Sequence, residues 1–286
     1  MTKRLAARFG LVGKPNPPGS PLVVIKPTPP PGGGSPGAVP GGGGPGPKPA
    51  PKPTPLPKAR PVVPTSAHKP LGTPVSNSLI IPPEHQALFG PVLEAIDLVH
   101  GDGNLPRIPL SISNTPHEEG SLNIAIKKGF PIRFDSLSLS DKGERPELTL
   151  AHEIGHFVEI GGILGPDNRR LQNYRMFNQD PKFEEWKETV ASSDAITQLK
   201  HIRQLSSTDR DHAKFITYLV SDHDTWARAY AQYIAVRSGD LTLLLQLDRV
   251  RSSQGSFVAR SQWKDSDFKN IAAALDNLFR KLGWRE

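Results

Sequence analysis

The stretch PELTLAHEIGHFVEI, residues 146–160, decides how the rest of the chain is interpreted. Its apolar positions recur with helical periodicity, and His152 and His156 stand four residues apart, so both imidazoles fall on one face of the predicted helix. Two imidazoles so arranged can bind one metal ion, and Glu153 beside them can take a proton from water without being a ligand. Burying these polar groups among apolar neighbours is costly unless a metal compensates. The stretch therefore predicts a metal site on a buried helix.

Two histidines do not complete a catalytic zinc site, which typically has three protein ligands and one open position. The extended pattern HExxHxxGxxH is excluded, because the sequence has Glu159 and Gly162 at the glycine and third histidine positions. The best candidate for the third ligand is Asp224, within SDHDTWARAY, residues 221–230. Its predicted helix face carries alanines, which would let the short aspartate approach the metal.

Other interpretations of residues 221–230 stay open. Ser221 and Asp224 have the spacing of a capping box, in which Asp224 would only stabilise the helix start. His223 is the alternative metal ligand. Arg228, one turn after Asp224, either orients that carboxylate or is an ordinary surface arginine.

The blocks LAHEIGHFV, residues 150–158, and DTWARAY, residues 224–230, resemble the zincin metallopeptidases, most closely the branch typified by the peptidase domain of anthrax lethal factor. The resemblance implies Zn²⁺ bound by His152, His156 and Asp224, with Glu153 as the general base that activates a water for peptide hydrolysis. Aspartate stands where that branch has glutamate. The branch also has a tyrosine near the reacting carbonyl, and Tyr218 lies close to that position.

The resemblance further implies a protein or peptide substrate that adds as a strand to the sheet edge, at residues 122–126 or 131–134. Residues 262–284 show a weaker likeness to peptidase-like domains associated with phage heads. The expected function is a zinc-dependent endopeptidase. The alternative is a catalytically weak zincin-like binding or structural module, carried on a proline-rich stalk in a phage particle or as a toxin or effector.

Composition divides the chain of 286 residues after Ser78. The first part holds most of the prolines, half of the glycines and no Asp or Glu, which predicts a disordered basic tail over 1–78. The remaining 208 residues have 25 basic and 28 acidic side chains, so the pI near 9.6 belongs to the tail and no nucleic-acid partner is expected. The tail is interpreted as a linker, with a carrier or assembly partner as the alternative.

No stretch has the length of a membrane span, and the basic N-terminus is not a convincing secretory signal. The expected location is the cytoplasm by default, or outside the cell by a non-classical route. The absence of cysteine excludes disulfides and thiol catalysis.

The predicted fold class is α+β, a small sheet followed by a mostly helical zincin-like domain over 79–286. A strand over 107–113 and a hairpin of 122–126 with 131–134, turning at 127–129, form the sheet. Besides 146–160, helices are predicted over 83–100, 181–205, 211–220, 225–236, 241–249 and 265–282, with Gly161 and Gly162 ending the helix of the motif.

Overall fold

The computed structural model describes residues 69–101, 104–114, 119–125, 133–164, 180–205, 210–252 and 262–286. The predicted turn at 127–129 and most of the predicted tail lie outside these residues. None of the described helices has the length and hydropathy needed to cross a membrane.

Four short strands form one mixed sheet in the order β1-β2-β4-β3. Neighbours β1 and β2 are parallel, as are β2 and β4, whereas β3 runs antiparallel to β4. The strands are β1 (Leu79–Ile80), β2 (Ile108–Ser113), β3 (Gly120–Ala125) and β4 (Arg133–Ser140). Among the described strands, β3 is therefore the outer strand at the end of the sheet opposite β1.

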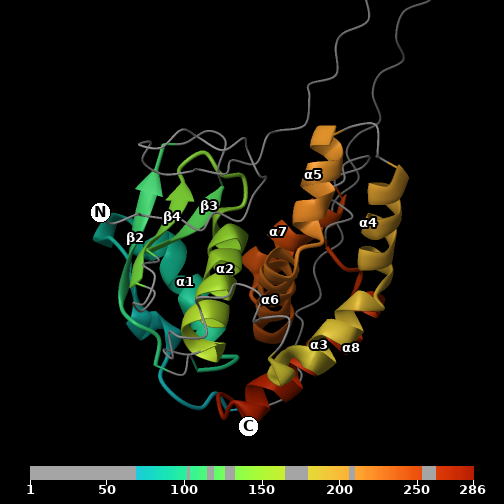
Figure 1. Ribbon diagram of the computed structural model, residues 1–286. Helices are drawn as coiled ribbons and strands as arrows, with labels where there is room; N and C mark the ends of the chain where they lie inside the picture. Colours follow the sequence, from blue (N-terminus) through green and yellow to red (C-terminus); the bar gives the residue numbers. More distant parts are fainter. Residues whose placement is uncertain are drawn as a thin grey trace, which may run out of the picture.

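Helices pack against this sheet and against one another in an α+β arrangement (Figure 1). Helix α2 lies between the sheet and α6, and it contacts β3, β4, α1 and α6. The α-helices are α1 (Gln86–Asp97), α2 (Pro146–Phe157), α3 (Glu184–Ala191), α4 (Asp194–Leu205), α5 (Arg210–Leu219), α6 (Asp222–Ser238), α7 (Leu241–Ser252) and α8 (Asp265–Lys281). Short helical turns are η1 (Val75–Ser78), η2 (Pro83–His85), η4 (Pro181–Phe183) and the π-helical η3 (Val158–Ile163).

Most predicted elements are confirmed, and one predicted helix and one predicted strand differ from the structure. The predicted helix over 181–205 is interrupted at Ser192 and Ser193, because the carboxylate of Asp267 on α8 accepts the N–H groups of Asp194 and Ala195 and starts a new helix there. The predicted second strand is longer than expected and runs to Ser140.

The predicted stop at Gly161 and Gly162 is wrong, since the chain continues from α2 as η3. A Cβ atom at Gly161 would lie 2.8 Å from the Leu105 side chain and 3.3 Å from Phe134. This glycine therefore permits close packing instead of ending the helix.

Residues 69–78, assigned to the tail from composition, pack as part of the folded domain. Val75 and Ser78 are buried, and Asp97 Oδ1 accepts hydrogen bonds from the backbone N–H groups of Val75 and Ser76. Pro70 also pairs with Arg285 in an antiparallel bridge. The folded region therefore begins earlier than the expected boundary after Ser78.

Candidate metal centre

Helix α2 begins with a cap supplied by another helix. Arg145 at the cap position makes no side-chain hydrogen bond to the helix start, and Pro146 needs no N–H partner. Gln246 on α7 instead accepts the N–H of Leu148 over 2.9 Å, and its amide donates to Glu147. This contact anchors the helix that carries the motif.

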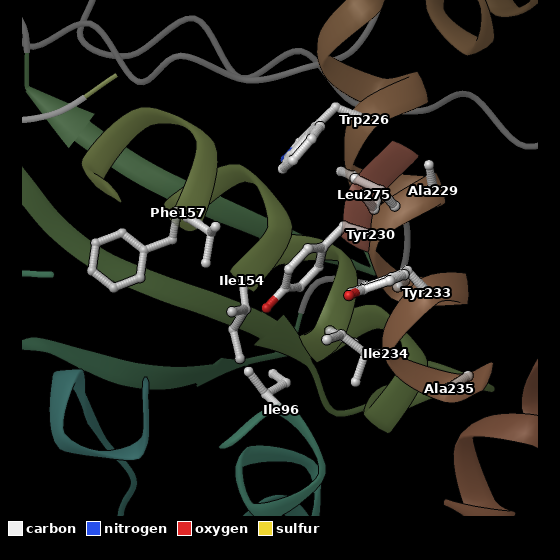
Figure 2. Close-up of a cluster of buried hydrophobic side chains, with 14 of the residues drawn as sticks. Ile96, Ile154, Phe157, Trp226, Ala229, Tyr230, Tyr233, Ile234, Ala235 and Leu275 are labelled. Atoms are coloured by element: carbon white, nitrogen blue, oxygen red, sulfur yellow. The ribbon is translucent and has the colours of Figure 1, made fainter. Parts of the chain in front are cut away.

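Helices α2 and α6 approach each other closely at Gly155, the small residue inside the motif. A Cβ at Gly155 would lie 3.1 Å from Ala227 Cα and 3.0 Å from the Tyr230 ring. The Gly155 carbonyl also accepts a hydrogen bond of 2.8 Å from the Trp226 indole. Figure 2 shows Trp226 and Tyr230 reaching from α6 toward α2, with the Tyr230 ring beside Ile154. The predicted small and aromatic residues of α6 thus bring its first turn next to the histidines.

The structure brings Asp224 to His152 across these two helices. His152 Nε2 lies 3.8 Å from Asp224 Oδ1, and the rings of His152 and His156 lie 4.9 Å apart. Two ligand atoms that are each about 2.1 Å from a tetrahedral ion lie about 3.4 Å apart. His152 and Asp224 are therefore near the spacing of two ligands of one ion.

Asp224 is buried, and its carboxylate has partners on both sides. Arg228 Nε donates to Oδ2 over 2.6 Å, which leaves Oδ1 toward His152. Tyr218 on α5 also hydrogen-bonds to Asp224. The Arg228 side chain is buried, so Arg228 is not an ordinary surface arginine. The structure therefore favours the hypothesis that it orients the Asp224 carboxylate.

One of the two hydrogen bonds of a capping box is present at the start of α6. Ser221 is the N-cap of α6, and its hydroxyl accepts the N–H of Asp224 over 3.4 Å. The Ser221 N–H bonds to the Tyr218 carbonyl, while the Asp224 carboxylate faces Arg228 and His152. The reciprocal bond of a capping box is thus replaced by contacts within the candidate site.

His223 turns toward a different partner. Its Nδ1 lies 2.5 Å from Oε1 of Glu159, a fully buried carboxylate in η3. The other carboxylate oxygen, Oε2, lies 3.8 Å from Nδ1 of His156. Burial alone would raise the pKa of Glu159, but His223 and His156 outweigh it, and the net shift of this pKa is downward. Glu159 therefore stands as an anion between two histidines.

Glu153 is buried beneath the start of β3. A Cβ atom at Gly120 would lie 2.8 Å from Glu153 Cγ and 3.0 Å from its Oε1. The backbone of the edge strand therefore passes directly over the carboxylate that the sequence singled out as the base.

Two pKa shifts describe the protonation of the site. Burial, with smaller contributions from His156 and Arg228, lowers the pKa of His152 to about 3, although Asp224 opposes the shift. Burial, followed by the charge of Asp224 and the hydrogen bond to it, raises the pKa of Tyr218 well above its usual value. His152 is thus a neutral imidazole, the form that binds metals, and Tyr218 keeps its hydroxyl proton.

The donor set of this region suits zinc, since neutral imidazoles and a carboxylate are its usual nitrogen and oxygen ligands. Within the described part of the chain, no three or more His, Asp and Glu side chains are arranged so that they could hold a metal ion as they lie. The structure brings together His152, His156, Asp224, Arg228 and Tyr218 from α2, α5 and α6.

The contacts of Glu159 with two histidines and the approach of Gly120 to Glu153 were not predicted from the sequence. Glu159 follows His156 by three residues, so helical spacing placed it beside that histidine. Its pairing with His223 depends on how α6 packs and had no signal in the sequence.

Comparison of the chain with known protein families, with characterised proteins and with solved structures found no match.

Proposed function

We propose that the chain is a zinc-dependent endopeptidase, with His152, His156 and Asp224 as metal ligands and Glu153 as the general base. The observation that carries the proposal is the 3.8 Å approach of Asp224 Oδ1 to His152 Nε2 across two helices. It supports the ligand set that the zincin resemblance implies, and the chain departs from that pattern only in the length of the acidic side chain.

A zinc ion held there would supply Lewis-acid polarisation of the scissile carbonyl and a water of lowered pKa. Glu153 accepts a proton as the water oxygen bonds to the carbonyl carbon, and then donates it to the amine as the C–N bond breaks. Tyr218 bonds through its hydroxyl to Asp224, and it would stabilise the negative charge on the carbonyl oxygen by turning this O–H donor toward the substrate. Arg228 fixes the Asp224 carboxylate by occupying its other oxygen.

The geometry favours β3 as the strand to which a peptide substrate adds. Of the two segments expected to serve, β4 has β2 and β3 as neighbours on its two sides, whereas β3 has β4 on one side. Because Gly120 of β3 lies over Glu153, a strand paired to the outer edge of β3 would run past the proposed base.

A second candidate is a binding or structural module with little turnover. The buried ion pair of Asp224 and Arg228 favours it, because Arg228 already compensates the Asp224 charge without a metal. This module would bind zinc weakly or not at all, and Glu153 would have no role in it.

Metal analysis of the purified full chain, together with cleavage of a fluorogenic peptide library, tests the proposal. We expect one zinc per chain and cleavage that stops on addition of a chelator. Glu153→Gln should retain the zinc and lose nearly all cleavage, whereas the same change at the exposed Glu144 should alter neither. Zinc without cleavage in the wild type, or full cleavage by Glu153→Gln, would contradict the proposed mechanism.

A further inference from the structure

Glu159 is a carboxylate buried without contact with solvent. Removing such a group from water is costly, so an apolar side chain would suit a purely structural position at lower cost. Glu159 lies in the π-helical segment η3 directly after the motif, and π-helical turns occur frequently at functional sites.

The carboxylate joins the two helix ends that carry the proposed ligands. From η3, Oε2 faces His156 Nδ1 at 3.8 Å, and Oε1 lies 2.5 Å from Nδ1 of His223, next to Asp224 on the first turn of α6. One buried anion therefore contacts both the last histidine of the motif and the neighbour of the acidic ligand.

The contact between Glu159 and His156 influences which nitrogen of the His156 ring carries the proton. A carboxylate beside Nδ1 favours the tautomer that carries its proton there, which leaves the Nε2 lone pair for a metal. We infer that Glu159 is a positioning residue that holds His156 in this tautomer and orientation, and that His223 in turn holds Glu159. The inference rests on the proposed metal site, because it assigns a task to residues around it.

The first test needs no metal. Nitrogen-15 NMR of the metal-free full chain, with the His156 signals assigned through His156→Gln, reports which ring nitrogen carries the proton. We expect Nδ1–H in the wild type and a mixture of tautomers in Glu159→Gln. A His156 protonated on Nε2 in the wild type would overturn the inference whether or not the protein is a peptidase.

The second test is zinc titration against a competing chelator. Removal of such an outer contact typically weakens metal affinity 10- to 100-fold, and we expect this for Glu159→Gln but not for the same change at the exposed Glu188. Glu159→Asp, which keeps the charge, should recover part of the affinity, and His223→Gln should lose less than Glu159→Gln. The cobalt absorption spectrum of each variant separates altered ligand geometry from lower stability.

The outcomes distinguish failure of this inference from failure of the proposed function. If the wild type binds zinc and a folded Glu159→Gln or Glu159→Asp binds it equally well with an unchanged cobalt spectrum, the positioning role is wrong and the proposed function stands. If Glu159→Gln does not fold, equal affinity of wild type and His223→Gln overturns the link through His223. If the wild type binds no zinc, the proposed function fails together with this inference.

Discussion

Arg228 Nε donates a hydrogen bond of 2.6 Å to Asp224 Oδ2 one turn earlier on α6, and both side chains are buried. Arg228 also donates to the Leu219 carbonyl and lies 5.2 Å from the centre of the Trp263 ring. The guanidinium is thus held on several sides, so the orientation of the Asp224 carboxylate is set before any ion binds.

Replacing Asp224 separates its electrostatic role from its proposed role as a ligand. Asp224→Leu leaves Arg228 as a buried charge without its carboxylate, which should lower the free energy of unfolding by about 3–5 kcal/mol. The double variant Asp224→Leu with Arg228→Leu should recover much of that stability and none of the zinc affinity. Denaturant melts and chelator competition on the same samples measure both. Intact zinc affinity in the double variant would reduce Asp224 to a structural residue.

Gly155→Ala should separate α6 from α2. Alanine favours a helix over glycine by up to about 1 kcal/mol, but the added methyl would press on the Ala227 backbone and the Tyr230 ring, and overpacking costs about 1–3 kcal/mol. We expect a net loss of stability and weaker zinc binding, since Asp224 moves away from His152.

Gly143→Ala is the matched control, because a methyl there would meet its nearest neighbour at an ordinary 3.5 Å. Thermal melts and zinc titration of both variants check the prediction. A Gly155→Ala protein as stable and as tightly zinc-bound as the wild type would show that the helices can separate freely.

We expect the folded protein to lose stability in acid because His100 is buried as a neutral imidazole. It is buried, its Nε2 lies 2.9 Å from the Tyr230 hydroxyl, and its ring stacks on Phe279 at 4.3 Å. Burial lowers the pKa of His100 from 6.5 to about 4. The unfolded chain therefore binds a proton more readily, so stability is full above pH 6.5 and falls as the pH drops toward 4, by an amount on the order of 3 kcal/mol.

Denaturant melts between pH 4 and 7 measure this slope. The low pKa of His152 acts in the same direction in the metal-free protein, so the difference between wild type and His100→Gln isolates His100. The pH dependence should be shallower in His100→Gln and unchanged in His201→Gln, whose side chain is exposed. Equal slopes in all three proteins would contradict the assignment.

Two truncations locate the start of the folded region. A chain beginning at Lys69 should melt as the full chain does, because the described contacts of the domain are kept. A chain beginning at Leu79 loses the buried Val75 and its bond to Asp97, which should cost at least about 2 kcal/mol. Equal melting temperatures of the two fragments would restore the boundary expected after Ser78.

The parts of the fold that depend on short-range periodicity could be predicted from the sequence. The helix of the motif, the hairpin strands and the α+β class follow from local spacing, and the structure confirms them. Asp224 could be named as a candidate because its helix carries small and aromatic residues. The contact itself depends on the close packing that Gly155 permits, and the sequence could indicate that only through residue size.

Other contacts that join distant segments could not be predicted. The Glu159 contact with His223 and the Gln246 cap of α2 each connect residues more than 60 positions apart. The start of the folded region was misplaced because proline and glycine content was averaged over 1–78. Only three of the ten residues 69–78 are proline or glycine, a smaller share than in the tail as a whole, and Asp97 and the C-terminal residues bind this segment.

The pairing of residues 69–71 with 284–286 also determines how the domain responds to mechanical load. Leu71 N–H bonds to the Trp284 carbonyl, and Glu286 N–H bonds to that of Lys69, so Lys69 and Glu286 lie side by side. Force pulling these two residues apart would load the hydrogen bonds one after another, and each is weak alone. The ends would peel open at low force, and α8 would bear tension before α2 and α6 were separated.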